Sequence, residues 1–453
     1  MLKNKIIYSA GLICIIAAGC AKKLDVLPTQ SIDQTTALGS SKDVEVTLIG
    51  CYDGLQSTSL YGGAIQYVAD LLGDNGDMRF GGTFQNLLEI YNKDITPINA
   101  TVSDIWIQAY TTINRCNNVL SAIDKVETAK QARIEGEARF IRGSLYFELA
   151  RIYGKTWDDG SNATNLAVPL VIVPTLAVTA ADFKKRNTVA EVYAQAIDDI
   201  TKAETLLPAS NGIYATKNAA AAQLSRIYLM QGKYAEARDA ANRVIISGRH
   251  TLATNFTTLF FTYINNGGAS PNEYIFSMVV TPQDGGNGFN TYYGVTISTI
   301  PGTAGRGDFR ILPAHVSLYE AADVRGQYFY VNAAGNRFTR KHLDRFGNAL
   351  VFRLAEMYLT RAECNFRLGT TVGATPLDDV NRIRNRAGLV SLATVTLADI
   401  LKERKLELAF EGHQLHDLKR TRATVGGLAW NSPKLIFPIP QREMDVNPNL
   451  VQN

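Results

Sequence analysis

Residues 219–248, AAAAQLSRIYLMQGKYAEARDAANRVIISG, carry the most informative pattern of this chain. Leu224 and Tyr228 stand four apart, Gly232 follows four residues later, and a second alanine-rich run begins at Tyr234. Residues four apart share one face of a helix, and glycine accepts the backbone angles of a tight turn. The stretch therefore predicts two helices, joined by a turn, that pack together through small residues.

These offsets match the tetratricopeptide helix pair. A chance amphipathic hairpin can also produce one such match, so the prediction of tetratricopeptide repeats needs a second pair in the same chain. FRLAEMYLTRAECNFRLG at residues 352–369, followed by PLDDVNRIRNRAG at residues 376–388, has the same character, with a longer link around Gly373. One such pair cannot bury its apolar face alone. We therefore expect several pairs to stack, near residues 130–250 and 350–388.

Start and stop signals predict where other helices begin and end. Ser40 or Ser41 is placed to cap a helix, and Thr188 with Glu191 makes a capping box. The helix that this box opens is expected to stop at Pro208, because proline cannot continue it. Apolar residues at helical spacing predict helices over residues 44–55, 105–120, 134–149 and 192–207.

Between the helical pairs, from residue 255 to residue 348, the character of the sequence changes. EYIFSMVV at residues 273–280 and GQYFYV at residues 326–331 resemble strands, and long glycine- and asparagine-rich loops surround them. DLLGDNGDMRFGGTF, at residues 70–84, is a second irregular zone. Loops this long are usually functional or disordered. The predicted fold class is mainly α, with tetratricopeptide-like helical pairs and an irregular, loop-rich C-terminal half that contains short strands.

The N-terminus has the layout of a bacterial lipoprotein signal. Two lysines precede an apolar run over residues 6–18, which is too short to span a bilayer and ends in small residues before Cys20. Cleavage there would leave Cys20 as the first residue, with its thiol carrying a diacylglycerol. An ordinary secretory signal with a chance cysteine is the alternative. We expect residues 1–19 to be the signal peptide and residues 20–40 to be a lipidated tether.

The composition is that of a globular protein. The chain of 453 residues is 46% hydrophobic and 19% charged, with a net charge of +4. A charge this close to neutral, without a basic run, argues against a nucleic-acid partner. Apart from Cys20 and the signal, the cysteines are Cys51, Cys116 and Cys364, whose spacing fits no metal site. We expect three buried thiols within helices, no bound metal and no cofactor.

Catalytic motifs are absent from the sequence. No GxSxG, P-loop, HExxH or CxxC pattern occurs, and the carboxylates show no pairing from which an acid and a base could be chosen. His413 and His416 lie one helical turn apart near Glu411 and Asp417, a spacing that would suit a metal. Histidines at the end of an amphipathic helix are more often satisfied by local hydrogen bonds. We therefore expect structural histidines and no enzyme activity.

Aromatic residues stand in the two irregular zones among glycine, asparagine, aspartate and threonine: Phe80, Phe84, Phe289, Tyr292 and Tyr293. Such rings either fold back to seal the core or form a platform for a flat, partly apolar ligand. A sugar ring is such a ligand, because one face carries C–H bonds and its rim carries hydroxyls. Polar residues beside the rings would bind those hydroxyls: Asp74, Asn75, Asp77, Arg79, Asn287 and Asn290.

We therefore predict that residues 70–84 and residues 282–294 meet on one exposed face and bind an oligosaccharide. Their shared composition argues against simple packing, because a core aromatic gains most from apolar neighbours. The candidate ligand-binding residues are Asn75, Arg79, Phe80, Phe289, Tyr292 and Tyr293.

A series of short blocks, in order along the chain, resembles the SusD/RagB family of Bacteroidetes outer-membrane lipoproteins. CAKKLDVLPTQ, at residues 20–30, is similar to the start of the family, and EGEARFIRGSLYFELARIYG, at residues 135–154, is similar to its most recognisable N-terminal motif. Further blocks are GCYDGLQ, WIQAYTTINRCNNVL, LYEAADVRGQYF, FRLAEMYLTRAE, VNRIRNRAGL, ERKLELAFEGHQLHDLKR and FPIPQREMDVNPNLVQN. Each block is weak alone, but their order is specific. The loops between them match no family pattern.

The resemblance implies a single α-helical domain over residues 41–453, with tetratricopeptide-like pairs in a right-handed superhelix and a loop-rich insert at residues 255–348. It also implies a non-catalytic lipoprotein, anchored in the outer membrane and facing the cell surface. Family members capture nutrients, usually oligosaccharides or polysaccharides, for a SusC-like TonB-dependent barrel transporter, whereas RagB-type members are associated with peptides. For this chain, the alternatives are a peptide-binding import lipoprotein and a glycan-degrading enzyme on a helical scaffold.

Overall fold

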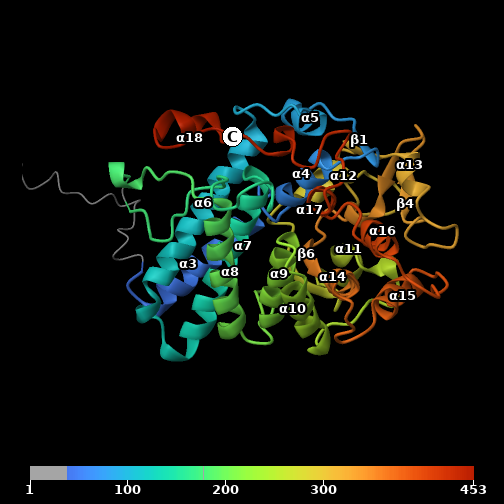
Figure 1. Ribbon diagram of the computed structural model, residues 1–453, viewed down its shortest axis with the longest axis horizontal. Helices are drawn as coiled ribbons and strands as arrows, with labels where there is room; N and C mark the ends of the chain where they lie inside the picture. Colours follow the sequence, from blue (N-terminus) through green and yellow to red (C-terminus); the bar gives the residue numbers. More distant parts are fainter. Residues whose placement is uncertain (1–37, 177) are drawn as a thin grey trace, which may run out of the picture.

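The computed structural model describes residues 38–176 and 178–453 of the chain (Figure 1). The expected signal peptide, the lipidation site Cys20 and residues 20–37 of the tether lie outside the described residues. Within the described ranges, none of the helices combines the length and the apolar character needed to cross a lipid bilayer.

The long helices form a row in which each helix packs against the next (Figure 1). In order, the row consists of α3 (Ser41–Gln56), α6 (Ala100–Ser121), α7 (Thr128–Tyr153), α8 (Val189–Leu206), α9 (Lys217–Met230), α10 (Tyr234–Ile246), α14 (Leu354–Leu368) and α15 (Pro376–Arg386). Each helix buries an apolar face against its neighbour, which a single pair could not do. The expectation of stacked tetratricopeptide-like pairs is confirmed.

The helix boundaries follow signals in the sequence. Ser40 caps α3, since its hydroxyl accepts a hydrogen bond from the backbone N–H of Asp43. Thr188 and Glu191 form the predicted capping box at the start of α8. Gly154 follows the last residue of α7. Local sequence chemistry therefore predicts the ends of these helices well.

Small residues allow α9 and α10 to pack closely. Ala237 and Ala241 of α10 are fully buried. Gly232, in the turn, has a φ of +67°, in the left-handed region that side chains with a Cβ rarely adopt. Leu229 and Ala237 pack against Cys364 of α14. The first predicted pair is thus joined directly to the second.

The three expected thiols are buried and free: Cys51 in α3, Cys116 in α6 and Cys364 in α14. Burial raises the pKa of the Cys364 thiol to about 12. It also raises the pKa of Cys116 well above its usual range. Because the thiolate is the reactive form, both cysteines are inert packing residues.

The region between α10 and α14 is irregular, as expected, and contains short antiparallel strands. β2 (Tyr274–Met278) pairs with β6 (Ala349–Arg353). β4 (Phe329–Val331) pairs with β5 (Arg337–Thr339). The sequence predicted β2 and β4 but neither of their partners, because strand pairing joins segments that are distant along the chain.

A third ribbon connects the two irregular zones. β1 (Met78–Phe80) pairs antiparallel with β3 (Phe309–Ile311), and the sequence predicted neither strand. Short helices complete the fold: α4 (Ala64–Leu72), α5 (Gln85–Asn92), α11 (Thr262–Asn266), α12 (Gly288–Tyr293), α13 (Pro313–Val316), α16 (Leu397–Glu407), α17 (Gln414–Arg420) and α18 (Gln441–Val446). The mainly α fold, with short strands in a loop-rich C-terminal half, is confirmed.

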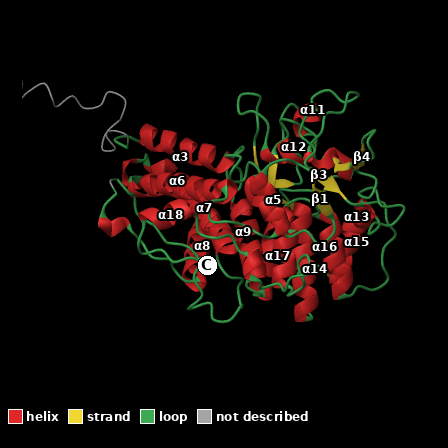
Figure 2. Ribbon diagram, turned by 90° about the horizontal axis from the view of Figure 1, so that it is seen from above, coloured by secondary structure: helices red, strands yellow, loops and turns green. Residues whose placement is uncertain are grey.

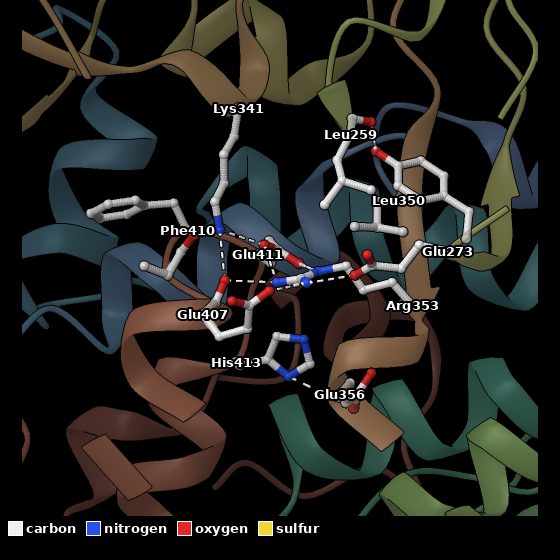
Figure 3. Close-up of polar contacts among 12 residues, drawn as sticks. Leu259, Glu273, Lys341, Leu350, Arg353, Glu356, Glu407, Phe410, Glu411 and His413 are labelled. Carbon is white, nitrogen blue, oxygen red and sulfur yellow. Dashed lines mark hydrogen bonds and ion pairs between the residues drawn. The ribbon is translucent and has the colours of Figure 1, made fainter. Parts of the chain in front are cut away.

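A buried ionic cluster holds this C-terminal half together (Figure 3). Arg353 of β6, whose side chain is 1% exposed, binds the carboxylates of Glu273, Glu407 and Glu411. The ammonium of Lys341 lies 2.5 Å from a carboxylate oxygen of Glu411. A buried charge that loses its partner is strongly destabilising. The cluster therefore fixes the segment between α16 and α17 against β6.

Candidate functional site

The two irregular zones of the sequence, residues 70–84 and 282–294, meet around α12, which lies beside β1, β3 and α5 in Figure 2. The backbone N–H of Gly288 donates to the carbonyl oxygen of Gly62, 2.7 Å away. Gly63 has a φ of +151°, and a Cβ there would lie 2.8 Å from the Cα of Gly288. Only glycine fits this approach, so the start of α12 is held directly against the start of α4.

One face of α12 is turned into the core. Phe289 is 3% exposed and stacks on His342, with ring centroids 4.5 Å apart, while Tyr293 is 0% exposed and meets Phe309 edge-on at 4.7 Å. The Tyr293 hydroxyl donates to Asp70 Oδ2, 2.9 Å away. Residues four apart share a helix face. The expectation that Phe289 and Tyr293 lie on an exposed face is therefore wrong, because the segment was interpreted as a loop.

The asparagines of the second zone are structural. Asn287 and Asn290 are buried. The amide nitrogen of Asn287 donates to the carbonyl oxygen of Gly347, 2.6 Å away. The amide nitrogen of Asn290 lies 3.0 Å from the carbonyl oxygens of Ala304 and Leu343. Both side chains hold neighbouring loops together, and neither is free to bind sugar hydroxyls as the sequence analysis expected.

The aspartates of the first zone are also occupied. Asp74 Oδ1 accepts hydrogen bonds from the backbone N–H groups of Asp77 and Met78, at 3.0 and 2.9 Å. The carboxylate of Asp77 accepts from His315 Nδ1 at 2.8 Å and pairs with Lys405 at 2.9 Å. Burial pushes the pKa of Asp77 upward, but these two partners outweigh it and hold the pKa below its usual value. Asp74 and Asp77 therefore shape the loop rather than face a ligand.

Asn75 and Arg79 remain exposed, and each contacts another loop. The side-chain oxygen of Asn75 accepts from the backbone N–H of Gly426 at 2.9 Å. The guanidinium of Arg79 donates to the side-chain oxygen of Asn336, between β4 and β5, at 3.1 Å. Of the predicted polar residues, these two keep surface that a ligand can reach.

Three of the predicted aromatic residues lie around the buried ring of Phe309, directly or through Tyr292, and we call them the aromatic rim: Phe80, Phe84 and Tyr292. Tyr292 stacks on the buried ring of Phe309, with centroids 5.5 Å apart and planes at 21°. Phe84 is 40% exposed and meets Tyr292 edge-on at 6.0 Å. The half-buried Phe80 ring lies 6.1 Å from Phe309. The guanidinium of Arg306 covers Phe84 at 4.5 Å.

A pocket of about 220 Å³ opens beside the aromatic rim. Tyr67 and Tyr292 line one part of it, and Asn86, Thr101 and Asp104 supply polar groups. The amide nitrogen of Asn86 donates to the hydroxyl of Thr101 at 2.5 Å. Partial burial raises the pKa of the Asp104 carboxyl above its usual value. The pocket thus combines ring faces with a few oriented polar groups, as small-ligand sites do.

Sequence analysis missed several residues that line this site: Tyr67, Asn86, Thr101, Asp104 and Arg306. The first four lie in α4, α5 and α6. Residues within helices were interpreted as part of the scaffold, so they were not considered as ligand contacts. Arg306 carried a detectable signal, because it is a charged residue in the glycine-rich loop TIPGTAGRGDF at residues 299–309. Only the folded chain brings these segments to one place.

His413 and His416 lie in buried surroundings that keep both rings uncharged. Burial, together with nearby arginines, lowers the pKa of both histidines well below the usual range, so both are neutral. The expected local hydrogen bonds are missing at His416, whose ring nitrogens are buried without a partner among the described residues. Across residues 38–176 and 178–453, no cluster of three or more His, Cys, Asp or Glu side chains is arranged to hold a metal ion.

Comparison with known proteins agrees with this architecture. Residues 24–229 match the SusD-like family model described as starch-binding and associating with the outer membrane. Residues 330–432 match the model of the SusD family. The chain belongs to the SusD/RagB family. The resemblance found in the sequence blocks is therefore confirmed.

Relatives cover almost the whole chain. A SusD-like protein of Formosa agariphila is 26% identical over 96% of this chain and 95% of its own. The starch-binding protein SusD of Bacteroides thetaiotaomicron is 24% identical over 99% of this chain and 98% of its own. A crystal structure of a SusD superfamily protein from Bacteroides thetaiotaomicron, 26% identical, superimposes with a TM-score of 0.77 over 91% of this chain and 99% of its own. The SusD fold thus extends over the described part of the chain.

Proposed function

We propose that this SusD/RagB protein is a non-catalytic surface lipoprotein that captures an oligosaccharide or polysaccharide and delivers it to a TonB-dependent barrel in the outer membrane. The observation that carries the proposal is the aromatic rim beside a polar pocket. Phe84 leaves 40% of its surface exposed beside Tyr292. A single exposed ring is ordinary on a protein surface, but rings that gather beside a polar pocket are typical of a small-ligand site.

The geometry of the rim suits a sugar chain. The rings of Phe84 and Tyr292 lie at 85° to each other; Arg306 covers one side of Phe84 and Phe309 covers one face of Tyr292, so a sugar stacks on the ring surface that these neighbours leave open. Sugar C–H groups pack against such faces. Asn86, Thr101 and Asp104, across the pocket, supply donors and acceptors for hydroxyls. The predicted candidates Phe289 and Tyr293 do not contact the ligand in this proposal. Their buried side chains hold α12, and therefore Tyr292, in place.

Anchoring and delivery rest on the N-terminal sequence and on the family. Residues 1–19 form the signal peptide, Cys20 carries the lipid, and residues 20–40 tether a single domain over residues 41–453. The roughly 19 residues from Lys22 to Ser40 reach at most roughly 65 Å from the membrane if fully extended. This keeps the domain within reach of a SusC-like barrel in the same membrane. The family description, starch-binding and associating with the outer membrane, supports this assignment.

Titration of the mature protein with a panel of oligosaccharides and peptides tests the proposal. We expect a dissociation constant between about micromolar and millimolar for a glycan, or about −8 to −4 kcal/mol. Tyr292→Ala and Phe84→Ala should each weaken binding by about 1–3 kcal/mol, by analogy with base stacking on aromatic rings. Phe366→Ala is the matched control, because Phe366 is 38% exposed near the end of α14, outside the site.

The outcomes separate the alternatives. Equal glycan affinity in both rim variants and the control would exclude the rim as the site. Binding of peptides but of no glycan would favour a RagB-type import protein. Release of shorter sugars during the titration would show an enzyme.

A further inference from the structure

The candidate site is bordered by an unusual pair of arginines. In the antiparallel ribbon of β1 and β3, Arg79 stands directly opposite Arg310. Side chains opposite each other lie on the same face of a ribbon, with Cβ atoms about 4.5–5.5 Å apart. Like charges in this arrangement repel each other. The ribbon therefore carries two adjacent cations at some cost to its stability.

Neither arginine is neutralised by the protein. Arg79 donates to the neutral side-chain oxygen of Asn336, and Arg310 donates to the carbonyl oxygen of Gly81, at 3.1 and 3.3 Å. The Nε atom of Arg310 is buried and has no hydrogen-bond partner among the described residues. Within residues 38–176 and 178–453, no carboxylate lies within 4.0 Å of either guanidinium. The described residues therefore leave both cations without an ion-pair partner.

The turn at Gly81 separates the arginine pair from the aromatic rim. A Cβ on Gly81 would lie 2.6 Å from the guanidinium carbon of Arg310, so this group packs directly on the turn that leads from Phe80 to Phe84. On the other side of this turn, Arg306 covers the ring of Phe84. Successive side chains of a strand point to opposite faces, so Arg79 and Arg310 project from the face of the ribbon opposite Phe80 and Phe309. A sugar chain lying on the rim meets Arg306 first and reaches the arginine pair by crossing the turn at Gly81.

The charge of the rim is unbalanced. Three guanidinium groups lie around the turn at Gly81: that of Arg306 covers Phe84, and those of Arg79 and Arg310 lie on the opposite face of the ribbon from Phe80. Asp308 pairs with Arg306 at 2.8 Å, which leaves two cations unpaired. Asp104 supplies a carboxylate to the separate polar pocket beside Tyr292. The two unpaired cations thus lie across the turn at Gly81 from the stacking surface, and the polar pocket lies beside Tyr292.

We propose that the ligand of this site is an acidic glycan, whose carboxylate or sulfate ester binds Arg79 and Arg310. Guanidinium groups present paired N–H donors that match the oxygens of both anions. An anion placed between the two arginines removes their repulsion. This inference rests on the proposed glycan-binding function and names the substrate class.

Matched glycan pairs test the inference. Oligogalacturonates and their carboxyl-reduced products form one arm, and sulfated galactan oligosaccharides and their desulfated products form the other. We expect the acidic member of at least one pair to bind at least tenfold more tightly than its neutral counterpart. The ratio should shrink as sodium chloride is raised, because salt screens exposed charges. The arm that responds distinguishes uronate from sulfate.

Variants locate the effect. Arg79→Gln and Arg310→Gln should each weaken binding of the acidic ligand about fivefold or more and leave binding of its neutral counterpart unchanged. Arg442→Gln is the control, because it removes the same charge from exposed α18, which lies far from β1 in Figures 1 and 2. Arg79 is exposed, so its variant is informative even if Arg310→Gln folds poorly.

Two results would overturn the inference in different ways. Neutral glycans that bind as tightly as acidic ones, with Arg79→Gln equal to Arg442→Gln, would exclude an acidic ligand while leaving the proposed glycan-binding function intact. Absence of binding to any glycan, acidic or neutral, would overturn the proposed function as well.

Discussion

The hydroxyl of Tyr293 donates a hydrogen bond to the carboxylate of Asp70, with 2.9 Å between the two oxygens. It joins α12 to α4, and the backbone N–H of Gly412 donates to the same carboxylate at 3.0 Å. Three segments that are distant along the chain are thus linked at one buried acid. Tyr292 of the aromatic rim precedes Tyr293 in α12, so the hydrogen bond to Asp70 helps to fix the position of the rim.

Asp70 should make stability depend on pH. Burial raises its pKa from an ordinary value of 3.8 to about 7, although Tyr293 and Gly412 act in the opposite direction. An acid whose pKa is higher in the folded state binds more protons when folded, so stability falls as the pH rises from about 4 to about 7. The slope from this group is at most about 1.4 kcal/mol per pH unit.

Urea unfolding of the wild type and of Asp70→Asn, measured from pH 4 to pH 8, checks this prediction. The difference between the two proteins isolates Asp70 from all other titrating groups. We expect the wild type to lose stability relative to the variant as the pH rises, with little further change above pH 7. A difference that stays constant across the range would show that Asp70 titrates near its ordinary pKa.

Replacing Gly63 should disturb the site more than replacing another glycine. Gly63→Ala places a Cβ 2.8 Å from the Cα of Gly288 and strains a φ of +151°. We expect a loss of more than about 1 kcal/mol of stability, together with weaker glycan binding, because α12 must move. Gly50→Ala is the control, since a Cβ there meets nothing within 4 Å. It should stabilise α3 by about 0.5–1 kcal/mol. Melting temperatures and titrations compare the two variants.

The buried ionic cluster should be essential for stability. Arg353→Met removes the partner shared by Glu273, Glu407 and Glu411, which leaves buried carboxylates short of positive charge. We expect a loss of about 3 kcal/mol or more, measured by urea unfolding. Arg442→Met, on the exposed face of α18, should change stability by less than about 0.5 kcal/mol. Similar losses in both variants would mean that the cluster contributes no more than a surface charge.

The lipid anchor makes a prediction for cells. Cys20→Ala should release the mature chain from the membrane fraction, because the thiol that accepts the lipid is gone. Labelling with a radioactive fatty acid should mark the parent protein and not the variant. A parent chain that stays unlabelled, with a variant that remains in the membrane fraction, would exclude the lipoprotein assignment.

Local patterns in the sequence predicted the helical row and the family. The tetratricopeptide pairs, the caps at Ser40 and Thr188 and the buried thiols all follow from interactions between residues a few positions apart. Such interactions depend on local spacing along the chain, so the sequence predicts them even when the contacts between distant segments are unknown. The same holds for the loop zones, whose glycine and asparagine content excluded regular long helices.

What the tertiary structure decided is which side chains face solvent and which segments are neighbours. Phe289 and Tyr292 looked equivalent in sequence, yet the short helix α12 buries the first and leaves the second at the rim. Arg79 and Arg310 became neighbours only through the pairing of β1 with β3. Burial and strand register depend on contacts between distant segments, and no spacing along the chain encodes them. The sequence by itself therefore determined the scaffold, and long-range packing determined the site.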